Sequence, residues 1–303
     1  MPNKILSMTK IELSAYPDHQ ALLERVRKIR HVALDMDGTI YKGNTLFPYT
    51  VPFLARLKAM GVGYSFLTNN PSKSIAGYLK HLKTMGLPVT ADELYTSAQA
   101  TVNCLKTNYP AAKRLFILGT PDMMSEFEKA GYISTADDPT DEPDAVVVGF
   151  DMTLTYWRLC RAAWWIHCGK PYVATNPDRV CPTDQPTILV DCGSICAMLE
   201  KATGRKPDIT LGKPLSEMLD GILNTHGLHP CEVAVAGDRV YTDMLMAHKA
   251  GAFGALVLSG EATMSDANKA NPLPDVTLQS IEQLGELIAE AKKILPLHQI
   301  HNS

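Results

Sequence analysis

The chain has 303 residues, of which 46% are hydrophobic and 20% charged, and its formal net charge at pH 7 is −3. At about 100–200 residues per domain this length predicts about two domains, and the apolar share is enough for a packed core. The near balance of 29 basic and 32 acidic residues argues against an electrostatic nucleic-acid binder. No run of about 18 apolar residues exists that could span a membrane.

The cysteine usage bears on the compartment. Seven cysteines without a Cys-x-x-Cys pair indicate free thiols in a reducing environment. The opening segment, MPNKILSMTKIELSAYPDHQ, has no apolar core of signal-peptide length. We therefore expect a cytoplasmic protein with neither a nucleic-acid nor a membrane partner.

Short apolar runs alternate with helical patterns along the chain. The runs do not alternate with polar residues and are rich in β-branched or aromatic residues, which is typical of strands buried on both faces. In chain order they lie at 32–34, 64–67, 115–118, 145–148, 172–174, 233–236 and 255–258. Apolar spacings of three and four predict helices between them, at 195–202, 215–223 and 284–295, with a further helix near 21–29. This alternation predicts βαβ units and an α/β protein with a parallel sheet.

The strongest motif is DMDGTIY, residues 35–41, which follows the first buried run. Alternate side chains of an extended segment point the same way, so we expect Asp35 and Asp37 to face one pocket and Met36 to face away. Gly38 permits a sharp turn that brings the backbone close to a ligand. Taken alone, the string also fits a strand-to-loop junction with a turn aspartate.

The second motif, Thr68 with Asn69 and Asn70, ends the run at 64–67. A hydroxyl group and free backbone N–H groups before a helix can hold an oxyanion. Taken alone, these residues are more typical of an Asx turn or a helix cap.

Two motifs follow much later in the chain. Lys213 precedes Pro214 at the entrance of a helix and could offset phosphate charge, although a lone lysine there is more often a solvated surface residue. Asp238 directly follows the run at 233–236, and Asp243 lies five residues on. Clustered carboxylates repel one another unless a cation joins them, and oxygen-rich sites suit Mg²⁺. A turn aspartate and a helix N-cap explain this pair equally well on its own.

Chance alone is unlikely to produce four motifs in the order Asp-x-Asp, Thr, Lys and Gly-Asp-x4-Asp. On these motifs the chain resembles the haloacid dehalogenase-like (HAD) phosphohydrolase superfamily over about residues 31–260. The resemblance implies that Asp35 is a nucleophile that forms an aspartyl-phosphate and that Asp37 is the general acid and then the general base. It implies that Thr68 and the backbone N–H of Asn69 hold the phosphate, beside the cation of Lys213.

The resemblance also implies a Mg²⁺ cofactor. The metal would be bound by the carboxylates of Asp35 and Asp238 and by the carbonyl oxygen of Asp37. Asp243 would bind it through a water molecule or would hold the residues that bind it. Asp37 points to phosphate esters, because a dehalogenase-type site has no alkoxide leaving group that needs a proton.

The spacing of the motifs locates an inserted domain. Thr68 and Lys213 are 145 residues apart, whereas a βα unit needs about 30. We expect an inserted α/β cap at 99–206, with strands at 115–118, 145–148 and 172–174, and a doubly wound, Rossmann-like core of the HAD fold at 1–98 and 207–303. This insertion matches the C2-type cap of the NagD-like (class IIA) group, and the narrower resemblance rests on 149–156, 174–178 and 192–207.

A cap of this kind excludes water and contacts the leaving group. The candidates for substrate specificity are Asn176, Asp178, Arg179 and Cys181, for each of which plain loop chemistry is the alternative. Some relatives that act on vitamin B6 phosphates carry a histidine at the position of Cys181, so the cysteine argues against pyridoxal phosphate.

The resulting hypothesis is a Mg²⁺-dependent phosphomonoester hydrolase acting on a small phosphorylated metabolite, such as a sugar phosphate or a nucleotide-like ester. Two alternatives stay open: a phosphate-ligand sensor or interaction protein on the same scaffold, and a phosphotransferase. A homodimer formed through the cap is a further expectation.

Overall fold

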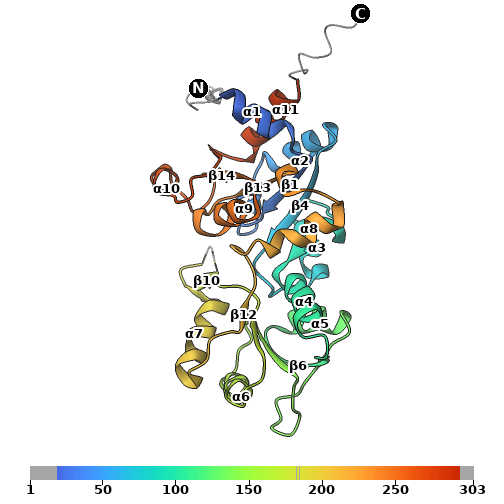
Figure 1. Ribbon diagram of the computed structural model, residues 1–303, viewed down its shortest axis with the longest axis vertical. Coiled ribbons are helices and arrows are strands. Elements are labelled where there is room, and N and C mark those ends of the chain that lie inside the picture. Colours follow the sequence, from blue (N-terminus) through green and yellow to red (C-terminus); the bar gives the residue numbers. More distant parts are fainter. Residues whose placement is uncertain (1–18, 182, 184, 294–303) are drawn as a thin grey trace, which may run out of the picture.

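The computed structural model describes residues 19–181, 183 and 185–293. Two parallel β-sheets, each flanked by helices, lie one above the other in an elongated molecule (Figure 1). The upper layers contain the early and late parts of the chain, and the lower layers contain the middle part, coloured green to yellow. This is the α/β architecture that the alternation of strands and helices predicts.

The first sheet, here called the core sheet, has six strands in the order β15-β14-β13-β1-β4-β5, with all pairings parallel. From β1 the chain adds β4 and β5 on one side and later β13, β14 and β15 on the other, so the strand order changes direction between β1 and β13, as in a doubly wound fold. In chain order the strands are β1 (His31–Asp35), β4 (Gly63–Thr68), β5 (Leu94–Thr96), β13 (Val233–Gly237), β14 (Phe253–Val257) and β15 (Val276–Leu278).

Helices cover both faces of the core sheet. One face packs against α1 (His19–Arg27), α2 (Thr50–Ala59), α3 (Ile75–Thr84) and α11 (Ile281–Lys293), and the other against α8 (Glu217–His226) and α9 (Leu245–Ala250). Val32 and Leu34 of β1 enter the first cluster, whereas Ala33 enters the second. Because both faces are covered, β1 has to be apolar at successive positions, which explains its unbroken apolar run.

Four shorter helices complete this part of the molecule, and one expected helix is only partly described. The short helices are η2 (Ala91–Glu93), η3 (Pro230–Glu232), η4 (Val240–Met244) and α10 (Met264–Lys269). The helix expected at 284–295 is α11, which is described as far as Lys293, so residues 294 and 295 lie outside the described part.

The second sheet, here called the cap sheet, has five parallel strands in the order β12-β9-β8-β6-β7. The three strands expected in the insertion are its centre, and the sequence missed the two edge strands, which have only two residues each. The strands are β6 (Arg114–Leu118), β7 (Ile133–Ser134), β8 (Ala145–Val148), β9 (Tyr172–Ala174) and β12 (Ile209–Thr210). Its faces pack against α6 (Tyr156–His167) with α7 (Cys192–Thr203), and against α4 (Ser97–Asn108) with α5 (Pro121–Lys129).

The chain passes between the two sheets at two places. The first is α4, whose Ala98 and Val102 pack with the cap sheet while Ala100 packs with the core sheet. The second follows β12, which pairs with the cap sheet although it lies beyond residue 206, the expected end of the insertion. The chain therefore passes from one sheet to the other within α4 and again after β12.

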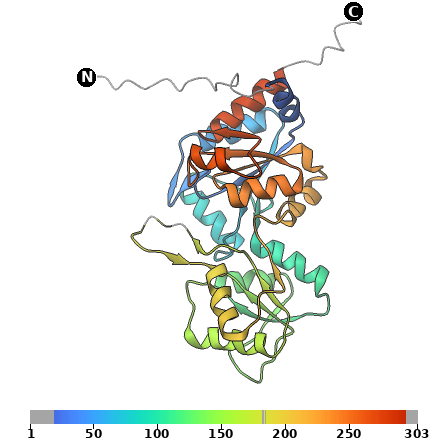
Figure 2. The same ribbon diagram turned by 60° about the vertical axis from the view of Figure 1, so that its left-hand side comes forward.

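Two small antiparallel hairpins lie where the layers meet. β2 (Tyr41–Lys42) pairs with β3 (Thr45–Leu46), and β10 (Val180–Cys181) pairs with β11 (Leu189–Val190). Figure 2 shows the β10–β11 segment extending sideways from the cap layers at the level of the core. Residues of both hairpins line one cavity.

Two sets of cap side chains differ in their burial. Cys192 and Cys196 are buried in the cluster beside the cap sheet. Of the tryptophans on α6, Trp165 is buried, whereas Trp157 and Trp164 are exposed. Among the described helices, none combines the length and the apolar character that crossing a membrane requires.

A buried histidine at the start of β1 makes stability depend on pH. His31 lies within hydrogen-bond distance of Ser65, at 2.9 Å between Nε2 and Oγ, and 4.4 Å from the ring of His226. Burial, and then the charge of His226, lower the pKa of His31 to about 4. Between pH 6.5 and 4 the unfolded chain therefore binds a proton at this residue that the folded chain excludes.

We expect the free energy of unfolding to fall as the pH decreases through that window, by up to about 3 kcal/mol from this residue. Denaturant titrations of His31→Gln should show a shallower fall than those of the unaltered protein. His248→Gln, which replaces an exposed histidine, is the matched control and should retain the full slope. Parallel pH profiles for all three proteins would contradict this prediction.

Candidate active site

The carboxyl ends of three neighbouring core strands meet at one edge of the sheet. β1 lies between β13 and β4, so Asp35 at its end has Asp238, just after β13, on one side and Thr68 on the other. In parallel sheets such an edge, where the strand order changes direction, is the usual ligand site. Lys213 reaches the same point from the loop after β12, although it lies far from the other motifs in sequence.

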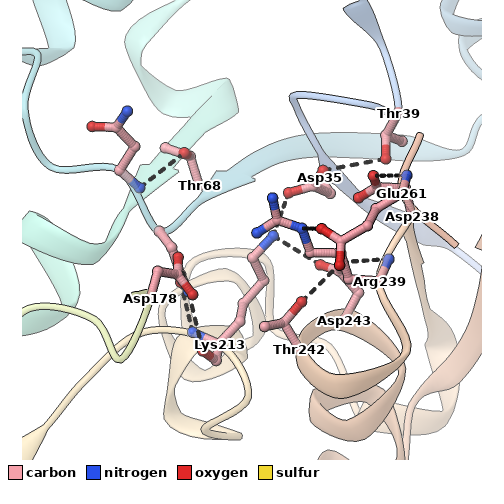
Figure 3. Close-up of polar contacts among 12 residues, drawn as sticks. Asp35, Thr39, Thr68, Asp178, Lys213, Asp238, Arg239, Thr242, Asp243 and Glu261 are labelled. Carbon is pink, nitrogen blue, oxygen red and sulfur yellow. Dashed lines mark hydrogen bonds and ion pairs between the residues drawn. The ribbon is translucent and has the colours of Figure 1, made fainter. Parts of the chain in front are cut away.

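Three carboxylates and one ammonium form the centre of this site (Figure 3). Lys213 donates from Nζ to Oδ1 of Asp35 and to Oδ1 of Asp243, the second at 2.8 Å. Thr39 donates to the other oxygen of Asp35 at 3.2 Å. The side chains of Lys213 and Asp243 are almost fully buried, and that of Asp35 is 13% exposed. Asp35 is therefore held on one side and still reachable from the cavity.

The charges in this cluster oppose one another strongly. Burial raises the pKa of Asp238 and Asp243, and the neighbouring carboxylate of Asp35 raises both further. Burial alone would lower the pKa of Lys213, but Asp243 and Asp35 outweigh it, and the net shift is upward. Lys213 therefore stays charged, yet one ammonium does not balance three carboxylates, although the guanidinium of Arg239 also lowers the pKa of Asp238 and Asp243.

The donor set fits a divalent cation. One carboxylate oxygen from each of Asp35, Asp238 and Asp243 lies within 4.8 Å of the others. Glu261 donates its backbone N–H to Oδ2 of Asp238 at 2.7 Å, while Oδ1 of Asp238 is buried without a hydrogen-bond partner among the described residues. An orphaned carboxylate oxygen facing two others is what a hard cation such as Mg²⁺ would satisfy.

The carboxylate of Asp238 packs against two glycines, at positions where any side chain would collide with it. A Cβ on Gly38 would lie 2.3 Å from Oδ2 of Asp238, and one on Gly260 would lie 2.0 Å from the same atom. Gly38 also has φ +85°, where side chains are strained. These glycines allow the carboxylate to come close to the turn after Asp37.

Asp37 lines the cavity beside Asp35, as the two-residue spacing predicts. Its backbone forms a bridge to Tyr41, and Gly38 N–H donates to the Tyr41 carbonyl at 2.7 Å, which closes the turn. Burial, and then the charge of Asp35, raise the pKa of Asp37 to about 6. The group can thus hold a proton in weakly acidic to near-neutral solution and release it again.

Thr68 and Asn69 lie on the other side of Asp35 and line the same cavity. The side chain of Asn69 has a role that its sequence motif did not indicate. Its Oδ1 accepts from the backbone N–H of Lys213 at 2.6 Å, and its Nδ2 donates to the Lys213 carbonyl at 3.0 Å and to Asp178 at 3.1 Å. Asn69 therefore fixes the loop that carries Lys213 and connects it to the cap.

The four residues expected to determine specificity divide into two pairs. Asp178 and Cys181 line the cavity, and Asn70 donates to the sulfur of Cys181 at 3.6 Å. Asn176 does not face the cavity as expected, because its side chain is fully buried and donates to Asp191 at 3.0 Å. Arg179 also points elsewhere: it is exposed and lines a neighbouring groove. The bond from Asn176 to Asp191 holds the loop after β9 in shape. The position of Asn176 next to Pro177 in the sequence did not indicate this role.

Sequence inspection missed several other residues of the site. Arg239 lines the cavity and forms an ion pair with Glu261 at 2.9 Å, and Thr242 donates to Asp243 at 3.3 Å. Both lie inside the motif at 237–243, so their position between Asp238 and Asp243 could have identified them as site residues. Asp122, from α5, accepts from the backbone N–H of Ser74 at 3.1 Å and adds a further contact between cap and core.

The cavity itself is small and polar at one end. Its volume is about 230 Å³, and both the core and the cap contribute to its walls. The cap side includes Phe150, Met152 and Leu189, and the core side includes Asn44 and the loop before α3. A space of this size suits a small molecule.

Comparisons with known proteins agree with this geometry. The family model described as haloacid dehalogenase-like hydrolase matches residues 32–133, and a HAD-hydrolase-like model matches 210–284. The ribonucleotide monophosphatase NagD of Escherichia coli K12 is 30% identical, over 84% of this chain and 98% of its own length.

Two solved structures are similar over nearly the same range. A 4-nitrophenylphosphatase from Thermotoga maritima is 38% identical, covering 86% of this chain and 98% of its own, with a TM-score of 0.81. A glycerol phosphate phosphatase from Mycobacterium tuberculosis, determined in complex with magnesium, is 30% identical, covering 86% and 78%, with a TM-score of 0.79.

The bonds of Asn69 predict a measurable loss of stability. Asn69→Ala leaves the buried N–H and carbonyl of Lys213 without partners, so we expect the free energy of unfolding to fall by about 2–4 kcal/mol in denaturant titration. Asp178→Ala removes only one of the three bonds and should cost less. Arg179→Ala, the exposed neighbour, should stay within about 0.5 kcal/mol of the unaltered protein. If Asn69→Ala costs no more than Arg179→Ala, Asn69 does not hold this loop.

Proposed function

This chain belongs to the haloacid dehalogenase-like hydrolase family, and we propose that it is a Mg²⁺-dependent phosphomonoester hydrolase acting through an aspartyl-phosphate. It is a phosphatase of the NagD-like group, like the relatives named above. The observation that supports the proposed chemistry most strongly is Asp35, which is buried beside Lys213, two further carboxylates and a proton-holding Asp37.

The first step would transfer the phosphoryl group to the protein. One oxygen of Asp35 attacks phosphorus, and the bond between phosphorus and the ester oxygen breaks. Asp37, which can be protonated near neutral pH, donates its proton to the departing oxygen, so the leaving group departs as an alcohol rather than an alkoxide. Lys213 and Thr39 hold the carboxylate of Asp35 in place during the attack.

The second step would regenerate Asp35. Asp37, now ionised, takes a proton from a water molecule while the oxygen of that water attacks the phosphorus of the aspartyl-phosphate. The bond to Asp35 breaks and inorganic phosphate leaves. Thr68 and the backbone N–H of Asn69 would hold the phosphate oxygens through both steps, a role supported by their position on the cavity wall at the end of β4.

Asp35, Asp238 and Asp243 would hold Mg²⁺ together with the backbone carbonyl of Asp37. When bound, the metal supplies positive charge that offsets the repulsion between an anionic nucleophile and an anionic phosphate. The relative crystallised with magnesium supports this choice of cofactor.

The substrate would be a small phosphorylated metabolite, because the cavity is small and is lined by residues of both the core and the cap. The named relatives act on ribonucleotides, 4-nitrophenyl phosphate and glycerol phosphate, so they do not agree on one leaving group. Cytoplasmic location and a cap-mediated homodimer stay predictions. A sensor role is less favoured than hydrolysis, because Asp37 lines the cavity beside Asp35, where hydrolysis would use it for proton transfer and binding alone would not need it.

Two changes test the proposed function on 4-nitrophenyl phosphate. Asp35→Asn should lower kcat at least about a thousandfold, because the amide is a poor nucleophile. Removing divalent metal with EDTA should abolish turnover, and added Mg²⁺ should restore it. Asp266→Asn, which changes an exposed aspartate on α10, is the matched control and should leave kcat within about twofold. Undiminished release of nitrophenolate by Asp35→Asn would refute the assignment.

The acid role of Asp37 predicts a dependence on the leaving group. An alkyl ester needs the proton at its departing oxygen, whereas nitrophenolate is stable as an anion. Asp37→Asn should therefore lower kcat/KM for an alkyl phosphate by about a hundredfold more than for 4-nitrophenyl phosphate. Equal losses for the two esters would show that Asp37 does not act as the acid.

A further inference from the structure

The two proposed steps leave a mostly buried guanidinium on the cavity wall without a role. Arg239 directly follows Asp238 and lines the cavity, and its side chain is only 17% exposed. It points into the same space as the side chains of Asp35 and Lys213 (Figure 3). A guanidinium keeps its proton in proteins, so Arg239 places a permanent positive charge beside the proposed nucleophile.

Two neighbouring side chains hold this guanidinium at its Nε atom. Nε of Arg239 lies 2.9 Å from Oε2 of Glu261, and the hydroxyl of Tyr241 donates to Oε1 of Glu261 at 2.7 Å. The side chain of Glu261 is 49% exposed. The bond from Tyr241 therefore restrains a carboxylate that would otherwise rotate freely in solvent.

The same residues are connected to the carboxylates proposed to hold Mg²⁺. The backbone N–H of Glu261 donates to Oδ2 of Asp238 at 2.7 Å, and the backbone N–H of Arg239 donates to Oδ2 of Asp243 at 3.3 Å. The guanidinium is therefore fixed relative to the end of the cavity where Asp35 lies. None of these bonds involves a cap loop.

The outer nitrogens of Arg239 lack an acceptor within the part of the chain that the structure describes. The ion pair with Glu261 occupies Nε, and neither Nη atom donates a hydrogen bond to a described residue. A mostly buried donor without an acceptor is costly, and an anion in the cavity would remove this cost. The planar fork of a guanidinium matches two oxygens of one phosphate group.

Resting on the proposed function, we propose that Arg239 binds the oxygens of the reacting phosphoryl group and that Glu261 and Tyr241 position its guanidinium. Arg239 then shares with Lys213, which comes from a distant loop, the negative charge on these oxygens in both steps. Glu261 and Tyr241 are positioning residues, because they act through Arg239 and not on the substrate.

A groove beside the cavity offers the competing use for this guanidinium. The groove is lined by Arg239, Tyr241 and Arg179, among others, whereas Arg179 does not line the cavity. The bonds that connect Arg239 and Glu261 to Asp243 and Asp238 favour the phosphate over a ligand in the groove. Arg179 thus serves as a matched control, because it is an arginine of the groove alone.

Binding of inorganic phosphate to the Mg²⁺-loaded protein tests the contact without turnover. In isothermal titration calorimetry, Arg239→Gln should raise the Kd of phosphate by about tenfold or more, the range of a hydrogen bond between charged groups. Arg239→Lys keeps the charge but not the fork, and should raise it by about threefold or more. Arg179→Gln should leave the Kd within about twofold of the unaltered value.

The positioning role of Glu261 predicts a loss that depends on Arg239. Glu261→Gln keeps the backbone N–H that holds Asp238, so the Mg²⁺ concentration for half-maximal activity should stay within about twofold. The Kd of phosphate should still rise by about threefold or more, and Tyr241→Phe should change it in the same direction. In the Arg239→Gln background, Glu261→Gln should have no further effect on phosphate binding.

The kinetics of two esters show which part of the substrate Arg239 contacts. The phosphoryl group is common to 4-nitrophenyl phosphate and an alkyl phosphate, so Arg239→Gln should lower kcat/KM by the same factor for both. This differs from the unequal losses expected for Asp37→Asn. A loss confined to one ester, with an unchanged Kd of phosphate, would assign Arg239 to the leaving group and overturn the proposal.

The other outcomes are distinct. Unchanged phosphate binding in both Arg239 variants overturns the contact and leaves the phosphatase assignment intact. If Arg239→Gln does not fold, Arg239→Lys and Glu261→Gln decide by the same criteria. Weaker Mg²⁺ binding in Glu261→Gln, or an equal further loss in the Arg239→Gln background, overturns the positioning role. If Asp35→Asn turns over phosphate esters as fast as the unaltered protein, the proposed function fails instead.

Discussion

The whole site depends on the repulsion among three neighbouring carboxylates, of which those of Asp238 and Asp243 are buried and that of Asp35 is partly exposed. Asp35, Asp238 and Asp243 have oxygens within 4.8 Å of one another, and a single ammonium, that of Lys213, lies among them. Such a cluster is stable only when further positive charge enters it, because burying unpaired anions is costly. In the proposed function, the same excess of negative charge that disfavours the empty site would attract a divalent cation and, with it, a phosphate ester.

The fold brings these groups together through strand order and through missing side chains. β1 and β13 are neighbours, so their carboxyl ends place Asp35 and Asp238 side by side. Glycines at 38, 237 and 260 leave the room that the carboxylates of Asp238 and Asp243 occupy. The core residue Asn69 connects to the cap, because its side chain binds both the Lys213 loop and Asp178. The position of the cap loop and the position of the Lys213 ammonium are therefore linked by one amide group.

The core motifs and the fold class could be predicted from the sequence, because both depend on local patterns. Buried strands need unbroken apolar runs, and Asp35 and Asp37 follow such a run directly. The insertion could be located because the distance from Thr68 to Lys213 is far more than βα units need. In contrast, β12 consists of two residues and gave no signal.

What the sequence did not reveal depends on contacts between distant segments. Asn69 binds a loop 144 residues away, and Asn176 turns inward because Asp191 accepts its amide. Side-chain direction in cap loops is set by such partners, so the residue types alone could not separate Asp178 and Cys181 from Asn176 and Arg179.

The most direct test of the account is a crystal structure with Mg²⁺ and beryllium fluoride, which mimics a phosphoryl group on a carboxylate. The account predicts beryllium bonded to an oxygen of Asp35, the cation between Asp35, Asp238 and Asp243, and the Lys213 ammonium in contact with the nucleophile. A cation bound elsewhere, or a fluoroberyllate that leaves Asp35 untouched while the cap is closed, would contradict it.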